Sequence, residues 1–162
     1  MHVAAAPFSH SSGPHDARIA LVGEAFGGQE ALIGQPFIGT AGQELTRLLA
    51  EAGIKRSECF LTNVIASRPY SESEFGRNYS NDFDTLCGPK ASVGDAYEWP
   101  PLSMGKYLRP EFLGEVERLR RELIVVRPNV IVALGAWPGQ PDDNDFGPPP
   151  GKRKPKVADV FS

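Results

Sequence analysis

Three side chains close to short apolar segments have the chemistry of a ligand-binding site. Glu24 follows the apolar run 17–23 and could orient a water molecule as a general base, or it could cap the loop. Phe37 stands between Pro36 and a glycine turn, where its ring could stack on a planar base or fill the core. Asn63 lies late in a second apolar run, and its amide could read a pyrimidine edge or satisfy a turn. For each residue taken alone, both alternatives stay open.

The loop in residues 21–42 is rich in glycine and carries a second acidic residue, Glu30. Backbone N–H groups of such a turn can hold an anion, although the same glycines would also serve a tight strand-to-helix connection. The spacing matches neither a phosphate loop ending in Lys-Ser/Thr nor a G-x-G-x-x-G that opens directly into a helix. Instead, an excursion through Phe37 precedes the predicted helix, which favours a base pocket over a generic phosphate loop.

Apolar periodicity predicts the elements that position these residues. Three buried strands and two helices are expected, at residues 17–23, 58–67, 129–135, 40–54 and 110–128. Their alternation predicts an α/β fold with a parallel sheet between helices, whose ligands bind at the carboxyl ends of the strands. Residues 70–109 are polar with scattered aromatic side chains, and form either a substrate-facing insertion or a partly disordered segment. Residues 1–17 are expected to be a loose arm.

Each predicted helix has an apolar face and recognisable ends. In the first helix, Thr40 and Gln43 have the spacing of a capping box and Gly53 suits the C-terminal cap. Its apolar face consists of Leu45, Leu48, Leu49 and Ala52. The second helix has Pro110 in its first turn. Its apolar stripe consists of Phe112, Val116, Leu119 and Leu123.

The composition limits the classes of protein to consider. A chain of 162 residues is long enough for one domain, and its formal charge of -3 gives no global case for nucleic-acid binding. A local basic groove would still suffice for DNA. No apolar run reaches the roughly 20 residues of a membrane span, and the first residues do not read as a signal peptide. Two cysteines, Cys59 and Cys87, favour a reducing compartment and argue against a disulfide framework.

Four ordered motifs resemble the uracil-DNA glycosylase superfamily, and most closely its iron–sulfur-type bacterial, archaeal and phage-borne branch. They read GEAFGGQE, GQPFIGTAG, TNVIASRP and PNVIVALG. The resemblance implies a three-layer α/β/α fold with a short parallel sheet, in which the family's last strand and helix have no counterpart. Residues 1–136 would form this domain, with 70–109 as an insertion, and the Pro/Gly-rich basic residues 137–162 would be a disordered tail.

The resemblance also implies roles for individual residues. The catalytic residues would be Glu24, which positions or activates the attacking water, and Glu30, the second acid of the loop. Uracil would stack on Phe37, and Asn63 would read its edge and reject cytosine. The backbone between the first glutamate and the helix would approach the base and the DNA phosphate, so the substrate-binding positions are Ala25, Gly27, Gly28, Phe37 and Asn63. The implied reaction hydrolyses an N-glycosidic bond of a flipped uracil.

Three departures from the family pattern shape the remaining expectations. Phe26 replaces a proline beside Glu24, and Ser67 replaces a cysteine of the iron–sulfur cluster. Two cysteines cannot hold a four-iron cluster, so we expect no cofactor and no metal. The family's His-Pro-Ser step is missing, so catalysis should be weak or absent. The alternative is a non-catalytic nucleic-acid-binding accessory protein of replication or repair. We expect a monomer without membrane contact that binds uracil-containing DNA, single- or double-stranded, in the cytoplasm, or in the host cytoplasm if phage-encoded.

Overall fold

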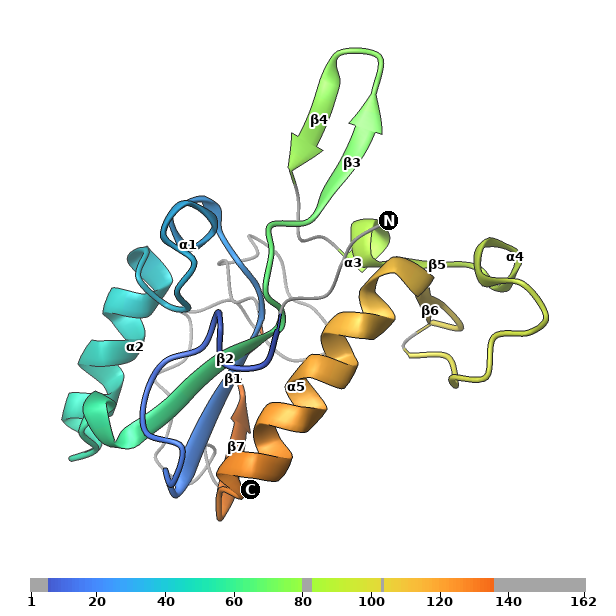
Figure 1. Cartoon of the computed structure of the whole chain (residues 1–162). Coiled ribbons are helices and arrows are strands. Elements are labelled where there is room, and N and C mark those ends of the chain that lie inside the picture. The colour runs from blue at the N-terminus through green and yellow to red at the C-terminus, as the bar shows by residue number, and fades with distance from the viewer. Residues whose placement is uncertain (1–5, 80–82, 103, 136–162) are drawn as a thin grey trace.

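A three-stranded parallel sheet forms the centre of the molecule. The computed structural model describes residues 6–79, 83–102 and 104–135. The strands are β1 (Ile19–Ala25), β2 (Cys59–Ile65) and β7 (Val130–Ala133), and they lie in the order β2-β1-β7 (Figure 1). The predicted α/β fold with a short parallel sheet is therefore confirmed.

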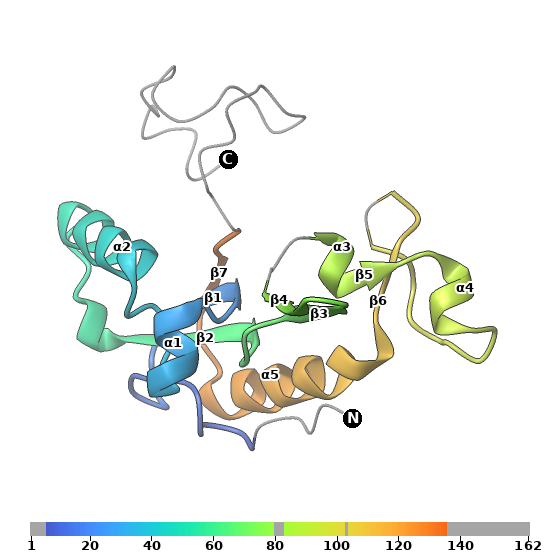
Figure 2. The same ribbon diagram turned by 90° about the horizontal axis from the view of Figure 1, so that it is seen from above.

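Helices cover both faces of this sheet. Alternate strand residues point to opposite faces, so each face builds its own cluster. On one face, α2 (Thr40–Glu51) contributes to a cluster of Leu21, Leu45, Leu49, Cys59 and Leu61. On the other face, α5 (Leu113–Val126) contributes to a cluster of Ala17, Ala20, Phe60 and Val126. Figure 2 shows α2 and α5 on opposite sides of β1 and β2.

The two ends of α2 differ in how well the sequence predicts them. Gly39 is the N-cap and has no side chain with which to cap the helix, so the capping box predicted for Thr40 and Gln43 is wrong. At the other end, Gly53 adopts a φ of 72° and the N–H of Ile54 donates to the Leu49 carbonyl at 2.8 Å, which confirms the glycine stop. Of the predicted apolar face, Leu48 remains 49% exposed.

The described part of the N-terminal arm packs against the sheet, so the prediction that residues 6–17 are loose is wrong. Ser12 forms an antiparallel bridge with Leu61 along the outer edge of β2. The N–H of Phe8 donates to Glu122 at 3.0 Å, and the Phe8 ring packs edge-on against Phe60 at 6.0 Å between centroids. The arm therefore belongs to the layer that contains α5.

Residues 70–109 hold a series of short elements that lacks any apolar periodicity. They are β3 (Tyr70–Ser73), β4 (Gly76–Tyr79), α3 (Phe83–Leu86), β5 (Cys87–Gly88), α4 (Lys90–Val93) and β6 (Tyr107–Leu108). The first two strands form an antiparallel hairpin that projects from the body of the molecule (Figure 1). The next pair, β5 and β6, is also antiparallel, and Leu86 and Cys87 pack with Ile65 and Phe112 in a third cluster.

The apolar stripe predicted for α5 is not the face that the helix buries most deeply. A 3-10 turn at Pro110–Phe112 precedes the helix, and of the four predicted residues only Phe112 is buried. The buried face of the helix consists of Glu115, Arg118, Glu122 and Val126. The reason is that these charged side chains pair with one another and with β2, so they can be buried without an isolated charge.

The prediction that the third strand is buried is also wrong. Val130, Ile131 and Val132 in β7 are 53%, 54% and 38% exposed. Within the described residues this strand pairs with β1 alone, so it forms an edge of the sheet. The predicted tail, 137–162, lies outside the described residues. In the part of the chain that the structure describes, no helix is both long and apolar enough to cross a bilayer.

Candidate functional site at the carboxyl ends of β1 and β2

The carboxyl ends of β1 and β2 bring Asn63 and Phe37 together around Gly23. Gly23 lies directly opposite Asn63 in the parallel register. A Cβ atom on Gly23 would overlap the Asn63 Oδ1 atom and would lie 2.7 Å from the Phe37 Cζ atom. The missing side chain of Gly23 is thus the space in which an amide and an aromatic ring meet. Sequence reasoning proposed Phe37 and Asn63 but did not identify Gly23 as the residue that makes room for them.

Phe37 is held in an unusual backbone conformation. Its φ is 56°, a region that a bulky residue rarely adopts. Arg56 Nη2 donates to the Phe37 carbonyl at 2.8 Å, and Arg56 Nη1 donates to the Gly42 carbonyl at 3.0 Å. A side chain on Gly42 would overlap the Phe37 backbone, so this glycine allows α2 to approach the loop. The ring itself is partly buried against the cluster on the α2 face.

Glu30 supports the same loop from the opposite side. It lies in the short helix α1 (Gly28–Ile33), and its Oε1 atom accepts the N–H groups of Ile38 at 3.1 Å and Gly39 at 2.8 Å. A Cβ atom on Gly27 would lie 2.8 Å from Glu30 Oε2. Glu30 is therefore engaged with the backbone that carries Phe37.

Glu24 and Ala25 end β1 and are only partly buried. Glu24 directly follows Gly23, which places it beside the meeting point of Asn63 and Phe37. Gly27 is the N-cap of α1, and both Gly27 and Gly28 are exposed. The predicted site residues therefore share one end of the sheet. Their individual roles in catalysis remain predictions.

Phe26, the departure from the family pattern beside Glu24, is a buried residue. It is 3% exposed, and its ring meets His10 edge-on at 5.9 Å between centroids. The Phe26 N–H donates to the Ser67 carbonyl at 3.2 Å, which joins the end of β1 to the end of β2. His10 Nδ1 lies 3.2 Å from the Gly34 carbonyl at the end of α1. The large ring therefore anchors the loop instead of filling the space around Gly23.

A buried ionic cluster on α5 holds β2 through hydrogen bonds from the α5 side of the sheet. We call Glu115, Arg118 and Glu122 of α5 the ionic cluster; their side chains are 3%, 1% and 0% exposed. Arg118 lies 2.9 Å from each carboxylate, and its Nη2 atom donates to the Asn63 carbonyl at 2.5 Å. Thr62 Oγ1 donates to Glu122 at 2.7 Å. The backbone of the predicted base-reading residue is thus tied to a buried charge network that sequence reasoning missed.

The residues present do not fit an iron–sulfur cluster. Cys59 packs in the cluster on the α2 face, whereas Cys87 packs in a different cluster with Phe112. A [4Fe–4S] centre takes four thiolates, and the whole chain has two. Burial raises the pKa of the Cys59 thiol, which favours the protonated form over the thiolate that a metal would need. At Ser67, the family's cysteine position, the hydroxyl oxygen is buried and has no hydrogen-bond partner within the described residues.

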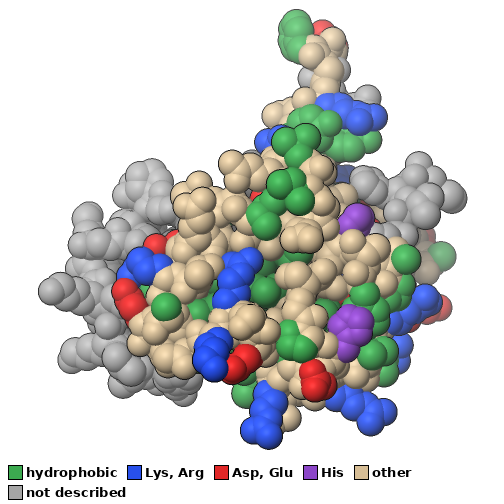
Figure 3. Space-filling view, turned by 60° about the vertical axis from the view of Figure 1, so that its left-hand side comes forward, with side chains coloured by type: hydrophobic (Ala, Val, Ile, Leu, Met, Phe, Trp, Pro, Cys, Tyr) green, Lys and Arg blue, Asp and Glu red, His purple; other side chains and the backbone are tan. Residues whose placement is uncertain are grey.

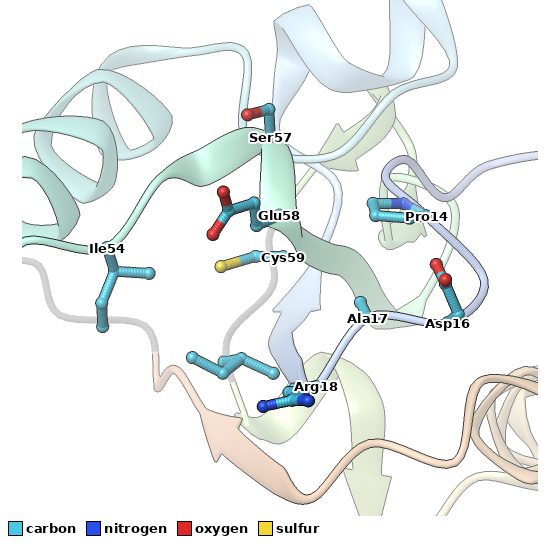
Figure 4. Close-up of a pocket in the computed structure, with 9 residues that line it drawn as sticks. Pro14, Asp16, Ala17, Arg18, Ile54, Ser57, Glu58 and Cys59 are labelled. Carbon is cyan, nitrogen blue, oxygen red and sulfur yellow. The ribbon is translucent and has the colours of Figure 1, made fainter.

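A pocket of about 350 Å³ lies at the other end of the strands. It is lined by Pro14, Asp16, Arg18, Ile54, Glu58 and Cys59, among others (Figure 4). None of the predicted site residues lines it. Because ligands of parallel sheets bind at the carboxyl ends, this pocket is not the candidate site.

Comparisons with known proteins agree with the arrangement at the sheet. Residues 10–141 match the family model described as the Uracil DNA glycosylase superfamily. A type-4 uracil-DNA glycosylase of Archaeoglobus fulgidus is 34% identical over 128 residues, which cover 79% of this chain and 48% of the relative. The enzyme of the same name from Thermotoga maritima is 32% identical over 121 residues, covering 75% of this chain and 46% of the relative.

A third relative, the type-4 uracil-DNA glycosylase of Sulfurisphaera tokodaii, is 40% identical over 120 residues, covering 74% of this chain and 40% of the relative. In all three comparisons the matched segment spans about half the length of the relative or less. The match includes β1, α1, α2 and β2, which are the elements that carry and flank the candidate site residues.

Proposed function

Because the chain belongs to the uracil DNA glycosylase superfamily, we propose that it hydrolyses the N-glycosidic bond of uracil in DNA. The observation that carries the proposal is the meeting of Asn63 and Phe37 over Gly23. An amide and an aromatic ring at the carboxyl ends of parallel strands are the groups that a flipped pyrimidine requires.

Phe37 and Asn63 divide the recognition of the base. Phe37 supplies the face on which the flipped uracil stacks, and this stacking offsets part of the cost of unstacking it from DNA. Asn63 can donate to the uracil O4 atom and accept from its N3–H group. Cytosine presents the opposite pattern at these two atoms, so an amide held in one orientation discriminates against it. Gly23 is required because any side chain there would fill this space.

Glu30 and Arg56 act as positioning residues for the Phe37 loop. Glu30 accepts two N–H groups immediately after Phe37, and Arg56 donates to the Phe37 carbonyl. Together they hold a phenylalanine whose positive φ would otherwise be unfavourable. We therefore propose that Glu30 contributes by ordering the loop and not by contacting the reacting atoms.

Glu24 is proposed to handle the attacking water. The water oxygen forms a bond to the sugar C1′ atom, and the bond between C1′ and uracil N1 breaks with its electron pair going to the base. Glu24 accepts the proton that the water loses, and its charge stabilises the cationic sugar of the transition state. The backbone of Ala25, Gly27 and Gly28 is proposed to approach the base and the adjacent phosphate.

In the family pattern, a histidine of a His-Pro-Ser step stabilises the departing uracil anion. The three histidines of the printed sequence are His2, His10 and His15, all before β1. Loss of one donor of the oxyanion-hole type costs roughly 10²–10³ in rate. Residues 1–162 on their own are therefore proposed to cleave slowly, and we propose that the protein acts where its substrate DNA is, inside the cell, as a monomer and without membrane contact.

The test is the formation of abasic sites in a single-stranded oligonucleotide that contains one uracil. Alkali should convert these sites into strand breaks, and a matched oligonucleotide with cytosine should remain intact. Asn63→Ala should lower kcat/KM by about 10-fold or more, because a buried donor and acceptor lose their partner, and Glu24→Ala should lower kcat.

Asn129→Ala, at an exposed amide before β7, is the control and should leave the rate unchanged. Breaks that form in Asn63→Ala at the wild-type rate would assign the activity to a contaminant. Binding of the oligonucleotide without breaks would show a nucleic-acid-binding protein without catalysis.

A further inference from the structure

The β3–β4 hairpin projects away from the sheet and contributes nothing to the core. Its strands have four residues each, with Tyr70 opposite Tyr79 and Ser73 opposite Gly76. Glu74 and Phe75 form the turn, and Gly76 closes it with a φ of 104°. Every residue of β4 is exposed. The space-filling view shows hydrophobic and basic side chains together on this protrusion (Figure 3).

Two arginines and two tyrosines of the hairpin region stack into one layer. The guanidinium carbon of Arg77 lies 4.3 Å from the Tyr70 ring centroid, and that of Arg68 lies 4.7 Å from the Tyr79 centroid. The two tyrosine rings are 5.6 Å apart. The order is therefore Arg68–Tyr79–Tyr70–Arg77, with the two tyrosine rings tilted by 60° to each other. These cation–π and ring contacts tie the two strands together, so they support the hairpin despite its lack of core packing.

The arm begins beside the candidate site. Pro69, which precedes β3, is almost completely buried and fixes the base of the hairpin. A Cβ atom on Gly28 would lie 3.4 Å from Arg68 Nη1, so the first arginine of the layer touches the loop that is proposed to approach DNA. The surface is therefore continuous from the Gly27–Gly28 loop through Arg68 to the outer part of the hairpin.

Phe75 at the turn is 98% exposed. Four strand residues at roughly 3.3 Å each place the turn about 13 Å beyond the base of the hairpin. A strand whose bases stay stacked rises about 3.4 Å per nucleotide along its axis, so the ring stands about four stacked nucleotides from the base of the hairpin. An aromatic ring at this distance can stack on a base only if that base is unpaired and available.

We propose that the hairpin binds single-stranded DNA that flanks the target uracil, with Phe75 stacked on an unpaired base about four nucleotides from it. This inference rests on the proposed function for the identity of the target. Stacking must carry the binding, since residues 68–79 contain two arginines and two glutamates and so have no net charge. Arg77 is placed to contact one phosphate in addition to the Tyr70 ring.

The experiment measures binding separately from cleavage. Fluorescence anisotropy is recorded with a single-stranded 15-mer that carries a non-cleavable 2′-fluoro-2′-deoxyuridine at its centre. A second 15-mer carries 2-aminopurine four nucleotides from the uridine on either side, whose fluorescence reports stacking. The variants are Phe75→Ala, Phe75→Trp and Arg77→Ala, with Leu102→Ala as an exposed apolar control in the same insertion.

Phe75→Ala should raise Kd by about 5- to 100-fold and should abolish the 2-aminopurine response on one side of the uridine. Phe75→Trp should restore both, and Leu102→Ala should change neither. Arg77→Ala should reduce the slope of log Kd against log salt by about 0.7, the value for one phosphate contact on a single strand. Melting temperatures should be unaffected by Phe75→Ala, because the ring is exposed.

Equal affinities of Phe75→Ala and Leu102→Ala would overturn the inference, as would a wild-type protein that does not bind the 15-mer. It would also be overturned if Phe75→Ala abolished only self-association, or only affinity for a duplex. Cleavage of a deoxyuridine substrate with no dependence on Phe75 would leave the proposed function standing and refute the hairpin's role. Binding that depends on Phe75, together with no cleavage of a deoxyuridine substrate, would support the hairpin's role and refute the proposed function.

Discussion

Replacing Arg118 with methionine tests whether the ionic cluster holds the site together. The substitution keeps most of the volume and removes a charge that is 1% exposed. Glu115 and Glu122 then lose their cation while their carboxylates are 3% and 0% exposed. The Asn63 and Val64 carbonyls also lose a donor, at 2.5 and 3.0 Å. The substitution therefore removes the cation from two buried carboxylates and removes one hydrogen-bond donor from each of two backbone carbonyls.

The expected loss of stability is large for a domain of this size. Breaking a buried ion pair by removing one partner costs about 3–5 kcal/mol, out of a typical total of about 5–15 kcal/mol. With an m-value of about 2 kcal/mol/M, the midpoint of urea unfolding should fall by about 2 M. Because Arg118 binds the Asn63 carbonyl, kcat/KM for uracil should fall even at temperatures where the variant remains folded.

Urea titrations followed by circular dichroism and by tryptophan fluorescence measure this shift, and coincident curves justify the two-state treatment. Arg121→Met is the matched control on the same helix, because its pair with Glu117 at 3.3 Å is exposed. An exposed pair contributes about 0–1 kcal/mol. If Arg118→Met lowered the midpoint no more than Arg121→Met does, the assignment of a structural role to the buried cluster would be refuted.

Three further predictions concern the loop and the thiols. Gly23→Ala should still fold, but its free energy of unfolding should fall by about 1–3 kcal/mol, which urea titration measures. It should also lose uracil cleavage in the oligonucleotide assay, because the added methyl group displaces Asn63. Glu30→Gln should retain both N–H bonds, because a single oxygen accepts them, and so should lower kcat/KM only modestly, whereas Glu30→Ala should lower it much further; equal activity of both variants would contradict a positioning role. Cys59 and Cys87 are both buried, and burial raises the pKa of Cys59, which therefore stays a thiol at neutral pH. Both cysteines should react with a disulfide reagent only after the protein unfolds.

The parallel sheet was predictable because its signal is local. The runs that became β1 and β2 are apolar segments bounded by turn residues, and neighbouring strands of this kind pair in parallel when helices separate them. The convergence of Phe37 and Asn63 was also predictable, because Phe37 lies in the connection after β1, Asn63 lies late in β2, and the two strands end at the same edge. The space over Gly23 was not, since the sequence does not show which glycine faces which side chain.

The orientation of α5 could not be read from apolar periodicity. The helix carries an apolar stripe that includes Val116, Leu119 and Leu123. The side chains that it buries against the sheet are nevertheless Arg118 and its two acidic partners, Glu115 and Glu122. Periodicity counts apolar residues and assumes that charges stay in water. A Glu-x-x-Arg-x-x-x-Glu spacing places three charges on one face, and that spacing is the signal that could have identified a self-paired buried surface.

The hairpin escaped prediction for a different reason. Its strands are polar and lack the alternation that a half-buried strand shows, because neither face of the hairpin packs on the core. Its stability comes instead from the Arg–Tyr layer and from a glycine at the turn. A hairpin of this kind is recognisable only from cross-strand pairs, which require the register to be known.

The ionic cluster lies next to the position at which the family pattern has a cluster cysteine. Ser67 occupies that position, and the preceding residue, Ala66, donates its N–H to Glu115 at 3.2 Å. Arg118 holds the same carboxylate at 2.9 Å. The segment after β2 is thus fixed by buried charge and not by metal ligation, and the same segment leads into Pro69 and the hairpin. A chelator should therefore leave the unfolding midpoint unchanged, whereas Arg118→Met should lower it and weaken DNA binding by the hairpin as well.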